Sequence, residues 1–205
     1  MRIAVVGGTG DFGLALARLL AEAGEDVVIG SRDAARAREA AEPVGARGAT
    51  NEEAVSGADL VVLAVKADAA LATAIALAPA IATTPTLSVA SELVFSKSGV
   101  RPRASEQSLA EEAAEILEGP VLAGLHSLAA STLAKGPADG DALVCGDDDD
   151  AKRLALQLAS KVVTGRALDA GPLANARALE GMTAVIVNLN RRYKGHAGLR
   201  VTGLP

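Results

Sequence analysis

Short apolar runs alternate with stretches of helical periodicity along most of the chain. The apolar runs predict strands, and the continuous run Leu60–Val65 is typical of a central parallel strand that is buried on both faces. Strands are predicted at Ile3–Val6, Val27–Ile29, Leu60–Val65, Thr86–Ala90, Val121–Leu125 and Ala142–Cys145. Helices are predicted at Asp11–Ala23, Asp33–Glu42, Asn51–Ser56, Asp68–Ala78, Ser105–Glu118, Asp148–Val162 and Pro172–Arg192.

The order strand, helix, strand, helix predicts an α/β fold of the Rossmann type, with a mostly parallel sheet and helices on both faces. Residues 1–125 are expected to form the nucleotide-binding domain, and residues 126–205 a smaller, partly helical C-terminal part that completes the pocket. Asp33 and Ser105 are expected to cap their helices, and Pro172 to open the last helix. The polar stretch from Ser91 to Arg103 is expected to be a functional loop.

A glycine-rich motif follows the first predicted strand. Gly8-Thr9-Gly10-Asp11-Phe12-Gly13 fits the pattern G-x-G-x-x-G and opens a helix within a strand-helix-strand unit, the context that makes the pattern specific for dinucleotides. Gly8 is expected to permit the tight turn, Gly10 the approach of a pyrophosphate, and Gly13 the close packing of helix on strand. The start of the helix offers free N–H groups and a partial positive charge to the phosphates.

The end of the second predicted strand favours NADP over NAD. An NAD site usually has an acidic residue here to hold the ribose hydroxyls, and this chain has Ser31 and Arg32 instead. A hydroxyl and a guanidinium suit a 2′-phosphate, and Arg36 lies one helical turn further on. Asp33 is interpreted as a helix cap and not as a ribose ligand.

Composition and charge exclude several other classes of function. The 205 residues are 50% hydrophobic with a net charge of −5, which argues against nucleic acid and against a polybasic membrane anchor. A single Cys rules out an intramolecular disulfide and a multi-cysteine zinc site. The uncharged stretch Ala69–Ser91 contains Pro79 and Pro85 and is interpreted as a helix, a turn and a strand, not a membrane span. We expect a cytoplasmic protein without a signal peptide.

Few side chains suggest acid–base, nucleophilic or metal chemistry. His126 follows a strand, at the sheet edge where ligands bind, and either contacts a ligand or packs under a loop for structural reasons. His196 lies in a glycine-flanked tail and is expected to be exposed. The run Asp147–Asp150 is interpreted as an acidic helix start and not as a metal site, and Cys145 as a small buried residue.

Several blocks of the chain together resemble the coenzyme F420-dependent NADP oxidoreductases. They are the run through Gly-Gly-Thr-Gly to Gly-Ser-Arg, then Leu125-His126-Ser127, Val144-Cys145-Gly146-Asp147-Asp148-Asp149, and Leu168-Asp169-Ala170-Gly171-Pro172-Leu173-Ala174-Asn175. The resemblance covers nearly the whole chain, and the last two blocks are its most specific parts. The chain differs from the family at Lys66 and Ala67, and at Ala129 and its neighbours, near where the deazaflavin is expected.

The resemblance implies hydride transfer between NADP(H) and coenzyme F420, with the two rings stacked. The 2′-phosphate contacts would fall on Thr9, Ser31, Arg32 and Arg36. Such a reaction needs little acid–base chemistry, because the cofactors carry the reactivity and the protein supplies position. The expected cofactor-binding residues are Gly8, Thr9, Gly10, Asp11, Phe12, Gly13, Ser31, Arg32, Arg36 and Val65, with His126 as the catalytic candidate.

The last predicted helix is apolar on more than one side, so it is either well buried or packs against a second copy in a homodimer. Arg191, Arg192 and Lys194 at its end either satisfy the helix dipole or hold the anionic tail of coenzyme F420. Two alternative functions remain. The first is an NADPH-dependent reductase of a small carbonyl or imine, for which Lys66, Lys97, His126 and Tyr193 are the available proton donors. The second is a protein that senses NADP(H) without turnover.

Overall fold

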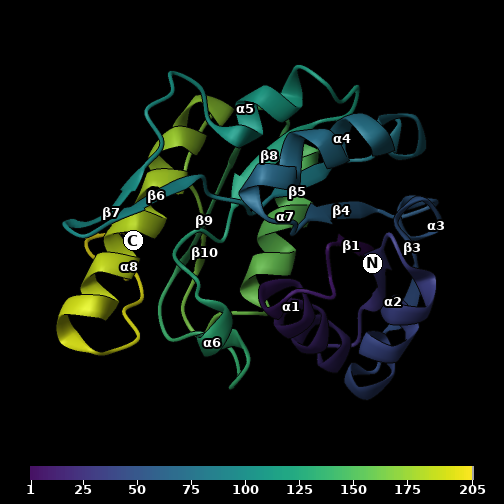
Figure 1. Ribbon diagram of the computed structural model, residues 1–205, viewed down its shortest axis with the longest axis horizontal. Coiled ribbons are helices and arrows are strands. Elements are labelled where there is room, and N and C mark those ends of the chain that lie inside the picture. The colour runs from purple at the N-terminus through teal and green to yellow at the C-terminus, as the bar shows by residue number, and fades with distance from the viewer. Residues whose placement is uncertain (205) are drawn as a thin grey trace.

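The computed structural model describes residues 1–204 and contains an eight-stranded sheet with helices on both faces (Figure 1). The strands lie in the order β10-β9-β8-β5-β4-β1-β2-β3. Their bounds are β1 Arg2–Val6, β2 Asp26–Ser31, β3 Arg47–Thr50, β4 Leu60–Leu63, β5 Thr86–Ser88, β8 Val121–Gly124, β9 Ala142–Gly146 and β10 Ala167–Asp169. The predicted α/β fold is therefore confirmed.

Alternating side chains of the central strands build two separate hydrophobic cores. Ile3 and Val5 of β1 face one core, and Ala4 and Val6 face the other. The first core is covered by α1 Asp11–Glu22, α2 Ala34–Ala41, α6 Ala130–Leu133 and α7 Asp149–Ser160. The second is covered by α3 Asn51–Val55, α4 Ala67–Ile81, α5 Leu109–Ala114 and α8 Ala176–Tyr193. The sheet is thus buried on both sides, as its continuous apolar strands predict.

One junction in the sheet is antiparallel. β9 runs against β8, with Leu122 opposite Gly146 and Gly124 opposite Val144, whereas β10 runs parallel to β9. The strands β1, β2, β4, β5 and β8 therefore end at one edge of the sheet, and β9 ends at the opposite edge. This reversal separates the sequence blocks of the C-terminal half from the glycine loop.

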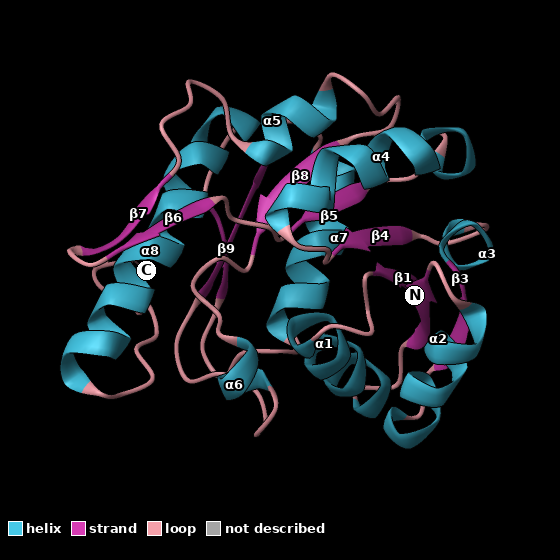
Figure 2. Cartoon of the chain, in the orientation of Figure 1, coloured by secondary structure: helices cyan, strands magenta, loops and turns pink. Residues whose placement is uncertain are grey.

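The segment expected to be a loop between Ser91 and Arg103 is a β-hairpin, so that prediction was wrong. β6 Leu93–Ser96 pairs with β7 Gly99–Pro102, and the hairpin lies against α8 (Figure 2). Asn188 of α8 binds both backbone groups of Val100: the Val100 N–H donates to Oδ1 at 2.9 Å, and Nδ2 donates to the Val100 carbonyl at 2.6 Å. The hairpin rests on this tertiary contact, which the polar composition of the segment does not reveal.

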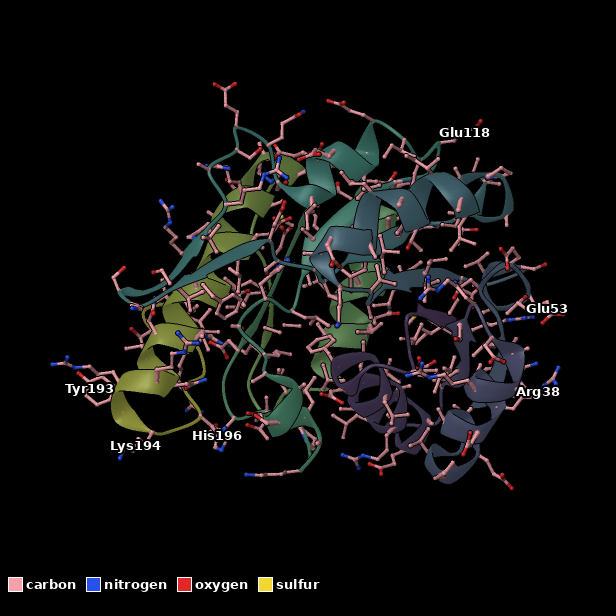
Figure 3. The ribbon with its side chains drawn as sticks, viewed as in Figure 1. Arg38, Glu53, Glu118, Tyr193, Lys194 and His196 are labelled. Carbon is pink, nitrogen blue, oxygen red and sulfur yellow. The ribbon has the colours of Figure 1, made fainter. Side chains whose placement is uncertain are left out.

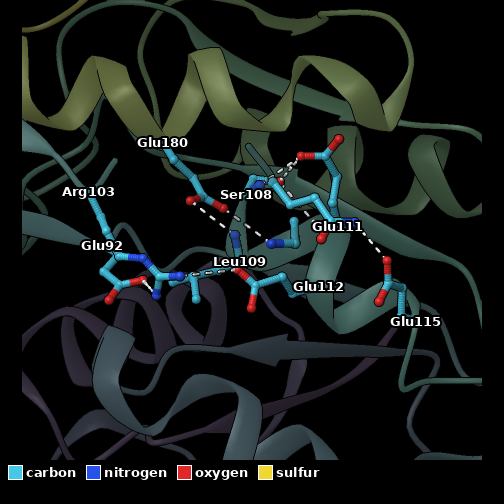
Figure 4. A network of polar contacts seen from close by, with 10 residues as sticks. Glu92, Arg103, Ser108, Leu109, Glu111, Glu112, Glu115 and Glu180 are labelled. Carbon is cyan, nitrogen blue, oxygen red and sulfur yellow. Dashed lines mark hydrogen bonds and ion pairs between the residues drawn. The ribbon is translucent and has the colours of Figure 1, made fainter. Parts of the chain in front are cut away.

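The helix after the hairpin begins later than predicted. Ser108, not Ser105, caps α5, and it forms a capping box with Glu111. Glu180 of α8 also accepts hydrogen bonds from the N–H groups of Leu109 and Ala110, both at 3.2 Å (Figure 4). Two of the unsatisfied N–H groups at the start of α5 are therefore bonded from another helix.

Smaller elements also differ from the predictions. The last helix, α8, begins at Ala176, after the 3₁₀ turn η2 Leu173–Asn175, so Pro172 precedes the turn and does not open the helix. A second 3₁₀ turn, η1 Glu42–Val44, follows α2. The short elements β3, β10 and α6 were not predicted. Each has three or four residues, too few for a hydrophobic period to emerge.

The uncharged stretch Ala69–Ser91 folds as predicted, as a helix, a turn and a strand. It supplies most of α4, the turn around Pro85, and β5. Within residues 1–204, no helix combines the length and the apolar character that crossing a bilayer requires.

Candidate functional site

The glycine loop makes its tight turn at Gly7, one residue before the motif. Gly7 has φ +78°, a conformation that favours glycine, and a Cβ there would lie 2.7 Å from the side chain of Val65. Gly8 has an ordinary φ, but there is no room for a side chain, since a Cβ would lie 2.8 Å from the Val5 carbonyl oxygen. The expected role of Gly8 in the turn thus belongs to Gly7, and Gly8 allows the loop to pack against β1 and β2.

The last two glycines of the motif have different surroundings. A Cβ at Gly13 would lie 2.7 Å from the Cα of Gly8, so this glycine lets α1 pack closely, but against the loop and not against the strand that was predicted. At Gly10 the nearest protein atom to a Cβ would be the Gly7 carbonyl oxygen at 3.5 Å, an ordinary contact. The protein itself therefore does not require glycine at position 10, and the exposed surface in front of this residue is open.

The start of α1 presents a row of N–H groups at this loop. Gly10 caps the helix, and the first intrahelical bond runs from the Leu14 N–H to the Gly10 carbonyl at 2.8 Å. The N–H groups of Asp11, Phe12 and Gly13 come before that bond and therefore have no partner within the helix. They are suited to an anion such as a pyrophosphate, and Thr9 adds a partly exposed hydroxyl beside them.

The end of β2 contains a hydroxyl and two exposed guanidinium groups. Asp33 accepts hydrogen bonds from the N–H groups of Ala35 and Arg36, at 2.9 and 3.2 Å, so its predicted role as a helix cap is confirmed. Ser31 accepts a hydrogen bond from the Asp33 N–H at 3.2 Å. Arg32 and Arg36 are exposed around this turn. The acidic side chain nearest the strand end is thus engaged, and the basic ones point to solvent.

Asn51 completes this edge of the site, and the sequence interpretation missed it. It begins α3 directly after β3, and its buried Oδ1 has no hydrogen-bond partner among residues 1–204. A Cβ at Gly30 of β2 would lie 2.8 Å from that oxygen, so glycine at this position leaves room for the Asn51 side chain. A polar residue at the carboxyl end of a strand was the available indication, but β3 itself was not predicted.

Further along the same edge of the sheet, beyond β4 and β5, the chain leaves β8 in a strained turn that carries His126. Leu125 is buried and has φ +66°, a left-handed conformation that is unfavourable for leucine. His126 is also buried, and its Nε2 lies 3.2 Å from the Ala90 carbonyl oxygen after β5. Because a carbonyl only accepts, Nε2 carries the proton, and the lone pair of Nδ1 has no partner among the described residues. Burial lowers the pKa of His126 to about 4, so its ring is neutral at pH 7.

Helix α8 stabilises this turn through a side-chain hydrogen bond. The Thr183 hydroxyl donates to the His126 carbonyl at 2.9 Å. The Ser91 hydroxyl lies 2.7 Å from the Thr183 hydroxyl, whose single proton is already used, so Ser91 donates this bond. One side chain of α8 thereby links the segments that follow β5 and β8.

The two most specific blocks of the resemblance lie side by side, but far from the glycine loop. Gly146 donates to the Gly171 carbonyl at 3.0 Å, and the Leu173 N–H donates to Asp147 at 2.9 Å. Lys152 reaches from α7 to Asp169 at 3.1 Å, and this carboxylate raises the lysine pKa. Because β9 is reversed, these contacts lie at the edge where β8 begins. They fasten β9 to β10 and do not contribute to the cofactor edge.

The remaining candidates are placed as follows. Asp148 caps α7, in line with the prediction of an acidic helix start, and Cys145 is buried, which raises its thiol pKa to about 11. Tyr193, Lys194 and His196 are exposed together at the end of α8 (Figure 3). Arg191 lies over the ring of Phe95 with 5.5 Å to the centroid.

The proton donors considered for a carbonyl or imine reductase do not gather around one point. Lys66 is exposed at the N-terminus of α4, Lys97 is exposed in the hairpin turn, and Tyr193 is 75% exposed at the end of α8. His126 is buried and neutral at pH 7. This arrangement favours a reaction in which the protein mainly positions two partners.

The known proteins that this chain resembles are named for NADP and coenzyme F420, in agreement with a dinucleotide site at the glycine loop. The family model described as NADP oxidoreductase coenzyme F420-dependent matches residues 2–92. A protein named F420-dependent NADP reductase from Methanothermobacter marburgensis is 40% identical over 223 aligned positions, which cover 100% of both chains. A solved structure from Arthrobacter sp. FB24, assigned as an F420-dependent NADP reductase, superimposes with a TM-score of 0.83 at 26% identity, again over 100% of both chains.

A more distant structure shares only the fold. An imine reductase from Bacillus cereus superimposes with a TM-score of 0.65 at 17% identity, and the match covers 94% of this chain but 62% of that one. The Methanothermobacter marburgensis protein matches end to end at 40% identity, and this degree of identity assigns the family. The chain belongs to the coenzyme F420-dependent NADP oxidoreductases.

Proposed function

We propose that this protein transfers a hydride between NADP(H) and coenzyme F420, with NADP(H) on the glycine loop and the end of β2. The observation that carries the proposal is the 40% identity to an F420-dependent NADP reductase along the entire chain. The geometry of the site supports it, because the free N–H groups of α1 and the exposed side chains of Arg32 and Arg36 lie along one sheet edge.

The residues present fit NADP(H). The pyrophosphate would lie on the N–H groups that start α1, where Gly10 leaves room for it. Ser31, Arg32 and Arg36 would hold the 2′-phosphate, and the capping role of Asp33 removes the carboxylate that would repel it. Thr9 and Val65 would line the crevice, and the unpartnered Oδ1 of Asn51 would accept a hydrogen bond from the adenosine half.

The second cofactor would lie over the ends of β5 and β8, next to His126. NADPH supplies the hydride and the deazaflavin ring of coenzyme F420 accepts it, or the reverse. His126 is the residue we assign to this ring, as a neutral hydrogen-bond acceptor through Nδ1, since a pKa of about 4 leaves the ring with a single proton at pH 7, which Nε2 donates to the Ala90 carbonyl. Its strained, buried turn would keep that lone pair in one position.

The larger organisation follows from the same arrangement. Residues 1–125 would bind NADP(H), and residues 126–205 would complete the coenzyme pocket, in a protein that we place in the cytoplasm. A homodimer is also part of the proposal. Apolar side chains stand exposed on β6 and α8, a surface suited to a second copy: Val94, Phe95, Val185, Leu189 and Tyr193. Light scattering on the purified protein tests this point directly.

The experiment that tests the function mixes the purified protein with NADPH and oxidised coenzyme F420 and follows the loss of the visible absorbance of the deazaflavin. NADH in place of NADPH, and riboflavin in place of coenzyme F420, are the controls. We expect rapid loss with NADPH and coenzyme F420 only. NADPH binding without any loss would refute the proposal, and turnover of a small imine or carbonyl instead would favour the reductase alternative.

Arg32→Gln tests the assignment of the 2′-phosphate. The variant is expected to lose about 10- to 100-fold in kcat/KM for NADPH and to leave that for NADH nearly unchanged, because a charged hydrogen bond to phosphate is removed. Arg38→Gln is the matched control, with the same change of charge on the exposed side of α2 (Figure 3). Equal losses in both variants would mean that only the overall charge matters.

A further inference from the structure

The chain returns to the sheet after α8. The Ala197 N–H donates to Asn190 at 2.5 Å at the start of this return. Residues 198–201, which we name the tail, then run along the segment that precedes β9. The Asp141 N–H donates to the Leu199 carbonyl at 2.6 Å, and the Val201 N–H donates to the Asp141 carboxylate at 2.8 Å.

The carboxylate of Asp141 is the centre of this contact. Besides Val201, it accepts a hydrogen bond from the Arg166 N–H at 2.8 Å and one from the Arg166 guanidinium at 3.2 Å. Asp141 is 3% exposed, so few water molecules can replace these partners. The hydrogen bonds from Arg166 and Val201 hold the pKa of Asp141 at about 2, so the carboxylate is charged over the whole range in which enzymes are assayed.

Glycines allow the tail to lie directly on the backbone of its neighbours. A Cβ at Gly140 would lie 2.4 Å from the Leu199 carbonyl oxygen, and one at Gly198 would lie 2.5 Å from the Asp139 carbonyl oxygen. These distances are far below any van der Waals contact, so a side chain at either position would push the tail away. The tail is therefore packed tightly against the segment that precedes β9.

The same segment adjoins the His126 turn. Because β9 is antiparallel to β8, the start of β9 lies at the edge where β8 ends, and the Leu125 N–H donates to the Leu143 carbonyl at 3.2 Å. The Ser127 hydroxyl lies 3.5 Å from the Asp141 carbonyl oxygen. Asp141 thus has the segment carrying His126 on one side and the tail on the other.

We propose that Asp141 is a positioning residue that anchors the tail as one wall of the coenzyme F420 side of the site. The inference rests on the proposed function for the identity of the coenzyme. Asp141 itself touches no reacting atom. Its carboxylate fixes the backbone of Val201, and through it the distance between the tail and the His126 turn.

The test compares Asp141→Asn and Asp141→Ala with Asp139→Asn. Asp139 is the matched control, because it stands on the same segment and pairs with Arg200 of the tail at 2.8 Å, but is exposed. Steady-state assays would measure KM for coenzyme F420 and for NADPH separately. Hydrogen exchange at residues 198–201 would report on the tail itself, and thermal unfolding on the fold.

We expect both Asp141 variants to show faster exchange in the tail and a KM for coenzyme F420 raised about 5- to 20-fold, with KM for NADPH changed less than about twofold. The conservative Asp141→Asn variant keeps the shape of the side chain, so the test can still be made if Asp141→Ala does not fold. Asp139→Asn should resemble the unchanged protein in all readouts.

Three results would overturn the inference. A released tail with unchanged KM for coenzyme F420 would show that the tail is not a wall of the site. A parallel rise of both KM values with a lower melting temperature would show a merely structural role, and protected tail amides in Asp141→Ala would show that another contact holds the tail. If the unchanged protein does not reduce coenzyme F420 at all, the proposed function fails instead, which the wild-type assay reveals before any variant is made.

Discussion

The Thr183 hydroxyl donates a hydrogen bond to the carbonyl oxygen of His126, at 2.9 Å, and so connects α8 to the turn after β8. The turn needs this support, because Leu125 immediately before it has φ +66°. Since Ser91 in turn donates to Thr183, the same hydroxyl connects the ends of β5 and β8. The geometry of the proposed coenzyme side therefore depends on a residue more than fifty positions away in the chain.

Thr183→Val keeps the shape of the side chain and removes the hydroxyl. We expect kcat for hydride transfer to fall about 5- to 10-fold, because the His126 carbonyl and the Ser91 hydroxyl lose a partner and the turn relaxes. The dissociation constant of NADPH should stay within about twofold. Thr73→Val is the control, since the Thr73 hydroxyl bonds only the Ala69 carbonyl within α4. An unchanged kcat in Thr183→Val would contradict the positioning role.

The two glycines Gly10 and Gly13 predict different effects of substitution on stability. Gly13→Ala would place a Cβ 2.7 Å from the Gly8 Cα, so we expect a lower melting temperature together with loss of NADPH binding. Gly10→Ala meets the nearest protein atom only at 3.5 Å, so we expect a nearly unchanged melting temperature with NADPH binding weakened at least about tenfold. Calorimetry with and without NADPH measures both quantities. Tight NADPH binding by Gly10→Ala would argue against a pyrophosphate at this loop.

Glu180 predicts a pH dependence of stability. It is buried against the start of α5, and burial raises its pKa to about 7, with Glu111 and Glu112 on α5 adding to the rise (Figure 4). Arg103 and Arg177 line the small cavity beside it. A carboxyl whose folded-state pKa lies above its unfolded value of 4.5 favours the folded state below pH 4.5, and this contribution is lost as the pH rises through 7.

The expected size of this effect is about 3 kcal/mol between pH 4.5 and pH 8, at 1.4 kcal/mol for each unit of pKa. Glu180→Gln carries no titrating group and should lack this decrease in the free energy of unfolding. Urea titrations at several pH values measure it, and Glu118→Gln, which removes an exposed carboxyl (Figure 3), provides the control. Identical pH profiles for Glu180→Gln and the unchanged protein would show that Glu180 does not titrate in this range.

Cys145 is expected to be inert in the folded protein. Its thiol is buried, and desolvation raises the pKa to about 11, so very little thiolate exists at pH 8. Alkylation by iodoacetamide at pH 8 should be at least ~100-fold slower than in urea, where the chain is unfolded. Mass spectrometry follows the modification. Fast labelling of the native protein would mean that the region around β9 opens readily.

Local sequence patterns determined most strands of the sheet, several helix starts and the glycine loop of this protein. Apolar runs predict most strands of the sheet because parallel strands are buried on both faces. Asp33 was predicted as a helix cap, and Asp147–Asp150 as an acidic helix start, because both features involve only the next few residues. The glycine motif and the pair Ser31 and Arg32 also lie within one strand-helix-strand unit. Each of these features is encoded by neighbours in the chain.

The tertiary structure alone decided the contacts between distant segments. The reversal of β9 sends the block from Val144 to Asp149 to the edge opposite the glycine loop, although that block is one of the two most specific parts of the resemblance. The hairpin depends on Asn188, the start of α5 on Glu180, and the tail on Asp141. Such bonds join residues sixty to ninety positions apart, and a local pattern of apolar and polar residues contains no information about which distant partner a polar side chain will meet.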